Sequence, residues 1–301
     1  MAKSALIVGP PRSGTSLASS ILARAGYHVG SIGYVRKRVG DDHNPFGYFE
    51  ADRVVEANAV VLRRAGYPFH NTWTFRPEID KAAERRIGEL EPSDEDRLLL
   101  DDYEPHAPWL WKDPRLCFTL PYWSKLVDWS RTVVYLTTRD LADAYPSFRR
   151  KEWCGWSLSE RRRVRALVRR HTEAARRAVE NLALPFVSID YGDYAADPAG
   201  VAARLSEVFE IEVAPADLNF HPELDHSGLR GTVAAEVRRQ LKRLPRKPVE
   251  RLASLVPRRL LGLLFPERLH VHGSPGATPS AEGTSPGTDG ASVRGWQPPK
   301  A

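Results

Sequence analysis

A short apolar segment that runs into a glycine-bounded loop constrains the fold of this chain more than any other feature of its sequence. Residues 4–8 are small or apolar and partly β-branched, and the loop Gly9-Pro10-Pro11-Arg12-Ser13-Gly14-Thr15-Ser16 follows them directly. Apolar residues then recur at helical spacing until Gly26, which is placed to end a helix. We therefore expect a buried strand, a tight loop and a helix, an arrangement that directs backbone amides and the positive helix end at an anion.

The loop follows the spacing of the phosphate-binding loop of nucleotide triphosphatases, with one departure. Gly9 and Gly14 match the two glycines of the pattern G-x-x-x-x-G-K-[ST], but Thr15 stands where the pattern requires lysine. That lysine contacts the β and γ phosphates, so its absence argues against kinase or ATPase chemistry. Arg12 places a cation inside the loop instead. A purely structural strand-to-helix turn is the alternative interpretation.

The segments that follow alternate between strand and helix character. Strand-like runs occupy residues 109–112, 131–138 and 184–190, and helical periodicity covers residues 52–65, 81–90, 157–181 and 197–209. This alternation predicts an α/β fold, a three-layer sandwich with a mostly parallel central sheet similar to that of P-loop nucleotide-binding proteins.

Composition predicts one folded domain with a different C-terminal end. Residues 1–271 are expected to form a single domain, with a helical insertion at about residues 30–105. Residues 272–301 are rich in Gly, Pro, Ser and Thr and lack apolar periodicity, which predicts a disordered tail. The segment 236–269 is rich in Arg and Leu but interrupted by prolines, and it either packs on the domain or lies on an anionic membrane surface.

Charge, cysteine content and the N-terminus narrow the class of protein further. A net charge of +6 at pH 7 favours anionic partners without choosing among them. Cys117 and Cys154 are the only cysteines, too few for a disulfide framework and without zinc-site spacing, so we expect idle, buried thiols and no metal. No leader or anchor pattern opens the sequence, which favours a cytoplasmic enzyme.

The loop resembles the 5′-phosphosulfate loop of sulfotransferases that use 3′-phosphoadenosine 5′-phosphosulfate, PAPS. The resemblance implies that PAPS is the sulfuryl donor and that its loop contacts are Pro11, Arg12, Ser13, Gly14, Thr15 and Ser16. In that family the amides and hydroxyls of the loop hold the 5′-phosphate, and the basic residue contacts the oxygen that bridges to sulfur. Arg12 occupies the position of that basic residue.

Two further segments resemble the family in the same chain order, and each follows a predicted strand. Arg139 and Ser147, eight residues apart, match an Arg and a Ser that bind the 3′-phosphate of PAPS. Tyr191 matches a tyrosine that contacts the adenine, although Gly192 replaces the Glu of the family segment. Arg230, in a late Arg-Gly loop, either matches the basic loop that closes over the donor in many relatives or is a solvated surface arginine. Taken singly, Arg139 also fits a helix cap and Tyr191 a core position.

A base for the acceptor proton has several candidates. Glu50 lies in the insertion at residues 30–105, which the resemblance places on the acceptor side. It follows an aromatic turn that resembles a segment of bacterial relatives in which a carboxylate faces the acceptor, and it is our first choice. The alternative is that Glu50 only stabilises the start of the following helix. His43 is the nearby alternative. Lys112 resembles the family lysine that precedes the 3′-phosphate strand and is placed to neutralise charge on the sulfuryl group. Asp113 follows it and is placed to orient Lys112 or Arg115, or to form a structural ion pair.

The sequence therefore predicts a sulfotransferase that moves a sulfuryl group from PAPS to a hydroxyl or amine by in-line displacement, with no metal. The acceptor is a small molecule, a carbohydrate or a lipid, and we expect no nucleic acid partner. Two alternatives remain open: a P-loop kinase-like enzyme, and a noncatalytic protein that binds a nucleotide or a membrane surface.

Overall fold

The structure, a computed structural model, describes residues 1–31, 47–68, 74–75 and 78–221. His43 and Arg230 lie outside these residues, as do the basic segment 236–269 and the predicted tail.

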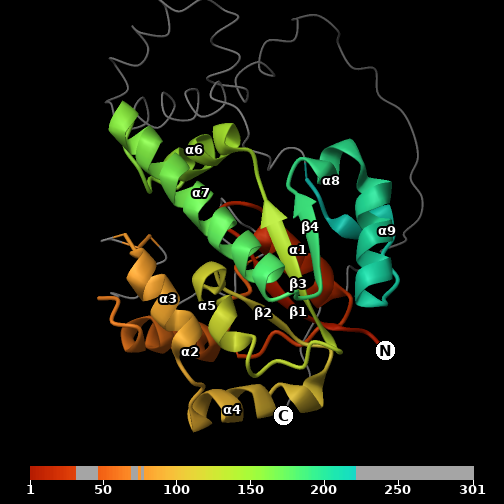
Figure 1. Cartoon of the computed structure of the whole chain (residues 1–301). Helices are drawn as coiled ribbons and strands as arrows, with labels where there is room; N and C mark the ends of the chain where they lie inside the picture. The colour runs from red at the N-terminus through yellow and green to blue at the C-terminus, as the bar shows by residue number, and fades with distance from the viewer. Residues whose placement is uncertain (32–46, 69–73, 76–77, 222–301) are drawn as a thin grey trace, which may run out of the picture. The chain divides into compact units, whose positions relative to one another are not determined.

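The centre of the fold is a parallel sheet of four strands in the order β2-β1-β3-β4 (Figure 1). The strands are β1 (Ser4–Val8), β2 (Leu110–Lys112), β3 (Thr132–Thr138) and β4 (Phe186–Asp190). β1 pairs with β2 on one side and β3 on the other, and β4 pairs with the outer edge of β3. All four predicted strands are present and all described pairs are parallel, which confirms the predicted fold class.

Helices cover both faces of the sheet, because alternate residues of its strands are apolar on each side. Leu6 and Val8 of β1 belong to a core cluster with helices α2 (Asp52–Arg64), α5 (Leu116–Trp123) and α7 (Leu158–Asn181). Ala5 and Ile7 point to the opposite face, whose cluster includes residues of α1 (Thr15–Arg24) and α9 (Pro198–Phe209). A parallel sheet buried on both faces with helices outside it gives the three predicted layers.

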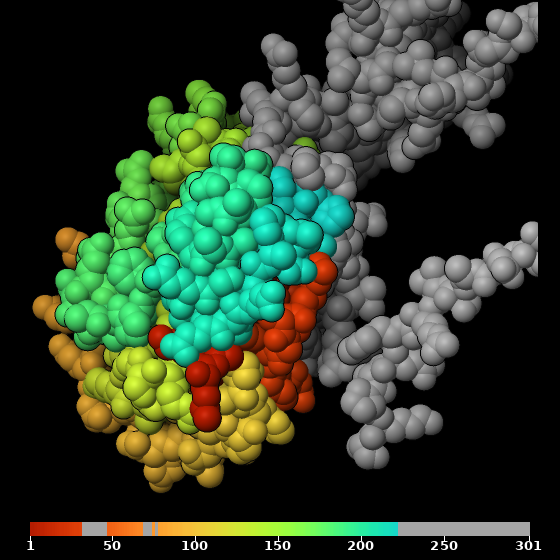
Figure 2. Space-filling model, turned by 90° about the vertical axis from the view of Figure 1, so that its right-hand side faces the viewer, coloured from red at the N-terminus to blue at the C-terminus, as the bar shows by residue number. Residues whose placement is uncertain are grey.

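The segment after β4 closes the α1 face. It contains α8 (Asp193–Ala196), α9 and the 3-10 helix η3 (Pro215–Leu218). In the space-filling view these residues, green to cyan, lie beside the red and orange-red N-terminal segment (Figure 2). Phe209 of α9 packs edge-on against Tyr27, just after α1, with ring centroids 6.3 Å apart. The last described residues therefore belong to the same core as the first strand.

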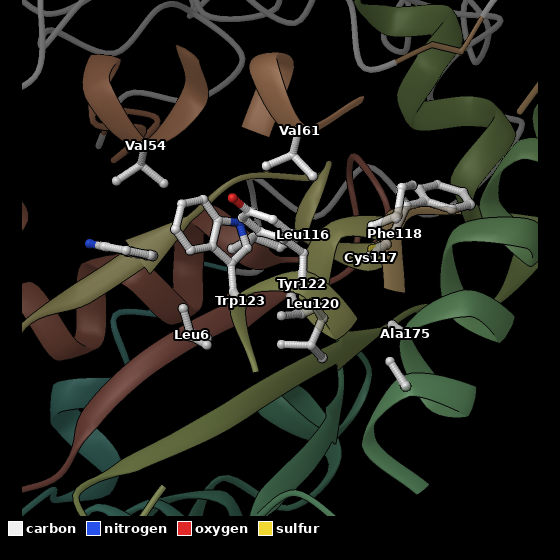
Figure 3. Packing of buried hydrophobic residues seen from close by; sticks show 14 of the residues in the cluster. Leu6, Val54, Val61, Leu116, Cys117, Phe118, Leu120, Tyr122, Trp123 and Ala175 are labelled. Carbon is white, nitrogen blue, oxygen red and sulfur yellow. The ribbon is translucent and has the colours of Figure 1, made fainter. Parts of the chain in front are cut away.

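The α5 helix was not among the predicted helices, and its burial explains why. Every one of its residues except Pro121 is buried, so it has no polar face and no amphipathic period. α5 packs between the sheet and α2, with Trp123 near Leu6 of β1 on one side and Val54 and Val61 of α2 on the other (Figure 3). α5 therefore sets the height at which α2 lies above the sheet.

The other described helices fall between these strands and helices along the chain. They are α3 (Lys81–Glu89), α4 (Asp94–Asp101), the 3-10 helix η2 (Glu104–His106) and α6 (Leu141–Arg150). α4 was not predicted, although its start has a sequence signal: Ser93 and Asp96 form a reciprocal capping box. The predicted strand at residues 184–190 begins two residues later, after Ala183 takes a left-handed conformation with φ 49°.

α4 offers a matched test of this core. Leu99 is 3% exposed and Leu98, its neighbour on the same helix, is 59% exposed. We expect Leu99→Ala to lower the free energy of unfolding by about 2 to 5 kcal/mol, because it leaves a cavity in the core. Leu98→Ala should change it by less than about 0.5 kcal/mol. Urea denaturation of both variants measures the difference, and equal losses would contradict the described packing of α4.

Candidate active site

The carboxyl ends of the four strands meet at one edge of the sheet, and each leads into predicted site residues. Gly9 follows β1, Lys112 ends β2, Arg139 follows β3 and Tyr191 follows β4. Parallel pairing brings these ends together: Ile7 is opposite Lys112. Ligands of open α/β sheets bind outside this edge. The predicted site residues thus share the position where such a fold binds its ligands.

The loop after β1 is held in shape by Ser13. Its amide donates to the Pro10 carbonyl at 3.2 Å, and its hydroxyl donates to the same oxygen at 2.7 Å. The hydroxyl also lies 2.7 Å from Thr137 Oγ1 on β3. Arg12 and Gly14 on either side have positive φ angles of 69° and 97°. The Ser13 hydroxyl is therefore turned into the loop, where it joins the loop to β3, and Pro11 beside it is buried.

The start of α1 is suited to an anion. Gly14 is its N-cap and supplies no side-chain acceptor, and no acidic residue lies in the first turn. Helices α3, α6, α7 and α9, in contrast, are each capped by an Asp or Ser side chain. The first amides of a helix need acceptors, and phosphate oxygens at this positive end satisfy them. Thr15 and Ser16 begin this turn, with Thr15 buried and Ser16 half-buried.

The cation of the loop contacts the other predicted phosphate site. Arg12 Nε donates to Ser147 Oγ on α6 at 2.9 Å, and Arg139 Nη1 donates to the Arg12 carbonyl at 3.2 Å. Asp140 caps α6 through the Ala142 amide, so capping is the role of Asp140 and not of Arg139. Ser147 is fully buried. Two guanidinium groups and a hydroxyl, predicted separately from the sequence, are thereby brought to one place.

Tyr191 lies over the same cluster. The guanidinium carbon of Arg139 is 4.1 Å from the centre of its ring, a cation–π distance. A Cβ atom on Gly14 would lie 2.7 Å from Tyr191 Cδ2, so the ring closes directly on the loop. The amide of Gly192, where the family segment has Glu, donates to Asp190 Oδ1 at 2.9 Å. The turn after β4 is therefore held by a hydrogen bond from the Gly192 amide to the Asp190 carboxylate.

A second cluster joins Glu50 to Lys112. Lys112 Nζ lies 2.7 Å from Glu50 Oε1, and the two side chains are 3% and 18% exposed. The ring centre of Tyr48 lies 6.0 Å from Lys112 Nζ and 5.2 Å from Nζ of Lys151, which extends from the end of α6. The structure thus pairs two of the predicted catalytic residues, next to an aromatic ring from the turn that precedes α2.

Asp113, the residue after Lys112, is wholly buried and forms an ion pair with Arg115 at 2.8 Å. Burial raises the pKa of Asp113, while the neighbouring Arg115 charge lowers it, and burial is the larger effect. Of the two predicted carboxylates, only the Glu50 side chain is partly exposed.

Both cysteines are buried and free, as expected. Burial raises the pKa of the Cys117 thiol and raises that of Cys154 to about 11, so both are protonated at neutral pH and unreactive. Within the described part of the chain, no three His, Cys, Asp or Glu side chains are grouped as metal ligands. None of the described helices is long and apolar enough to span a bilayer.

Two hollows lie on the α7 side of the fold. One, of about 220 Å³, is lined by Phe75, Phe118 and His171 among others, between α5 and α7. The other, of about 770 Å³, is a groove between α3, α5 and α7. Neither hollow is lined by the loop or by Arg139, Ser147 or Tyr191, so both are separate from the predicted donor site.

The parallel sheet and the loop at its carboxyl edge define an α/β protein of P-loop-like topology. The sequence model of the Sulfotransferase family matches residues 5–215, more than half of the chain. The chain belongs to the sulfotransferase family, and the predicted family is confirmed.

Among solved structures, the chain is similar to the sulfotransferase domain from the Synechococcus PCC 7002 olefin synthase. The TM-score is 0.38 at 15% identity, and the match covers 75% of this chain and 80% of that chain. No curated protein matches the sequence.

Sequence reasoning missed Asn58 of α2, which is fully buried and bonded to Asp113. A signal for it exists, because Asn58 falls between Val54, Val55 and Val61, Leu62 on the apolar stripe of an amphipathic helix. A polar residue on such a stripe predicts a buried hydrogen-bonding partner.

Gly14 offers a test of the contact between the loop and Tyr191. Gly14→Ala adds a Cβ against that ring at a positive φ, whereas Gly26→Ala adds one at φ 94° with no atom within 4 Å. Both substitutions should cost about 1 to 2 kcal/mol of stability, from the left-handed backbone alone. Gly14→Ala should lower the free energy of unfolding further, because its Cβ also meets the Tyr191 ring, and urea denaturation of both variants measures the difference. An equal loss of stability in both variants would contradict this contact.

Proposed function

We propose that this protein is a PAPS-dependent sulfotransferase that transfers a sulfuryl group to the hydroxyl, or amine, of a small-molecule acceptor. The proposal rests above all on the convergence of Arg12, Arg139 and Ser147 beside the start of α1. The start of a helix alone is sufficient to bind one phosphate group. A second cation and a buried hydroxyl beside it provide a place for a second phosphate group. PAPS and its product 3′-phosphoadenosine 5′-phosphate, PAP, are ligands with two phosphate groups.

Each end of the donor has its own set of residues in this proposal. The amides of Gly14, Thr15 and Ser16, with the two hydroxyls, hold the 5′-phosphate at the start of α1. Arg139 and Ser147 hold the 3′-phosphate, and Arg12 reaches the oxygen that bridges phosphorus and sulfur. Pro11 and Ser13 shape the loop. The family role of Tyr191 at the adenine fits a ring that closes on Gly14.

In this proposal, the charged groups around the sulfur atom promote the transfer of the sulfuryl group. An acceptor oxygen attacks sulfur as the bond to the bridging oxygen breaks, and that electron pair passes to the 5′-phosphate of PAP. Arg12 and Lys112 stabilise the negative charge on the leaving oxygen and the sulfuryl group. Glu50 takes the acceptor proton, and the products are the sulfated acceptor and PAP. Glu50 suits this role better than Asp113, because the Asp113 side chain is fully buried against Arg115.

The predicted kinase-like alternative has less support. Thr15 occupies the lysine position of the triphosphatase loop, and no described residue replaces that lysine at the same place in the loop. The acceptor remains a small molecule, a carbohydrate or a lipid in this proposal, and membrane contact through residues 236–269 remains a prediction.

Donor identity is tested by calorimetric titration with PAP and with ATP-Mg. We expect PAP to bind far more tightly, and Arg139→Ala to weaken PAP binding by about tenfold to a hundredfold through loss of charged hydrogen bonds. Arg131→Ala is the control, since Arg131 lies at the opposite end of β3 and its side chain is 55% exposed. Preference for ATP-Mg, or equal losses from both variants, would overturn the donor assignment.

The base is tested by replacing Glu50 with Gln. PAP release from PAPS, with 2-naphthol and N-acetylglucosamine as probe acceptors, should fall by about a hundredfold or more because the acceptor proton has no base. PAP binding should persist, as no proposed donor contact is removed. Glu56→Gln is the control, an exposed carboxylate on the following helix. Retained turnover in Glu50→Gln would show that another group takes the proton from the acceptor.

A further inference from the structure

A buried polar network joins α2 to the residues that follow Lys112. Asn58 Nδ2 donates to the Val54 carbonyl and to Asp113 Oδ2, each at 3.0 Å. Asn58 Oδ1 accepts from the Thr119 hydroxyl and from Trp123 Nε1. An asparagine side chain has two N–H donors and two acceptor lone pairs, so all four are used. Asn58, Thr119 and Trp123 are each fully buried.

The partner of Asn58 is itself held rigidly. Asp113 Oδ1 accepts from the Arg115 amide at 3.0 Å and from Arg115 Nη1 at 2.8 Å, which leaves Oδ2 for Asn58. A buried ion pair costs desolvation, and well-packed apolar residues often replace such a pair without loss of stability. Apolar packing is not directional, whereas each hydrogen bond fixes both a distance and an angle between its two groups. The network therefore specifies register between α2 and the turn after β2.

The two elements that this network joins, α2 and the turn after β2, lie close to Glu50 and Lys112 along the chain. Asp113 directly follows Lys112, and Glu50 is separated from the first residue of α2 only by Ala51, the N-cap of α2. Phe49, before Glu50, has a positive φ of 55°, a strained conformation that the surrounding structure has to hold. A shift of α2 relative to β2 would thus move the carboxylate relative to the ammonium group.

We infer that Asn58 is a positioning residue that keeps the Glu50 carboxylate against Lys112 by locking α2 to Asp113 and α5. It contacts neither of the two residues that it positions. The inference rests on the proposed function for its catalytic consequence, but the geometry that it describes is testable without any acceptor.

The first test measures the chemical accessibility of Lys112. Its side chain is 3% exposed in the ion pair, so reductive methylation of the intact protein should label it slowly. Leucine has a volume similar to that of asparagine but can form none of the four hydrogen bonds. In Asn58→Leu, labelling of Lys112, as measured by mass spectrometry, should therefore rise severalfold. Asn58→Ser is the milder variant, with space for water, and should give the same change to a smaller degree.

Val61→Ala is the matched control. Val61 is fully buried on the same helix, so its loss destabilises α2 without removing a hydrogen bond. Val61→Ala and Asn58→Ser are compared at temperatures at which the same fraction of each protein is unfolded. Under these conditions we expect Lys112 to stay protected from labelling in Val61→Ala. Equal labelling in both variants would show general loosening of α2 and would overturn the inference.

The second test concerns turnover of PAPS. With 2-naphthol and N-acetylglucosamine as probe acceptors, the rate of PAP release from saturating PAPS should fall by about tenfold in Asn58→Leu or Asn58→Ser, since a misplaced reacting group slows the chemical step. The dissociation constant for PAP should stay within about twofold of wild type, because no proposed donor contact changes. Val61→Ala should keep both values.

The outcomes separate this inference from the proposed function. If wild type neither binds PAP nor consumes PAPS while Asn58 variants expose Lys112, the proposed function fails and the positioning role stands. If wild type consumes PAPS but the Asn58 variants keep Lys112 protected and their rate of PAP release unchanged, the positioning role is wrong and the function stands.

Discussion

The pairing of β1 with both β2 and β3 is the constraint on which the candidate site depends. β1 is the central partner of two parallel ladders, with Leu6 opposite Trp111 on one side and Val134 on the other. Parallel pairing places the loop after β1 between Lys112 and Arg139, although these residues lie about a hundred or more positions away in the chain. Apolar residues on both faces keep this strand buried, so the loop has a rigid support.

Close packing around Gly9 and Gly14 fixes the shape of the loop. A Cβ on Gly9 would meet the Thr137 carbonyl at 2.7 Å, so the chain leaves β1 in direct contact with β3. Ser13 then joins the loop to the same strand through Thr137 Oγ1. Further along, Gly14 lies under Tyr191. The loop is therefore enclosed by the ends of β3 and β4, which explains why its neighbours cannot be identified from the loop sequence itself.

Local sequence signals were sufficient for the strand, loop and first helix, and for the residues that end β3 and β4. Their patterns depend on neighbours in the chain: a short apolar run, two glycines, a helical repeat. α5 escaped prediction because a helix buried on all sides has no period to detect. The pairing of Glu50 with Lys112 escaped it as well, because it depends on how α5 supports α2 above the sheet. Apart from Val54, the partners of Asn58 lie in the turn after β2 and on α5, and not on its own helix.

Arg12 has a particular position between the two phosphate sites of the proposed donor. A guanidinium has five N–H donors in a rigid fork, and one of those of Arg12 already reaches Ser147, the proposed 3′-phosphate ligand. The lysine of a triphosphatase loop is a single point charge and serves one chain of phosphates. An arginine whose backbone lies in the 5′-phosphate loop and whose side chain contacts the 3′ site can respond to both groups at once. In the proposed function, Thr15 in place of that lysine and the presence of Arg12 both suit a ligand whose two phosphate groups lie at different positions of the same ribose.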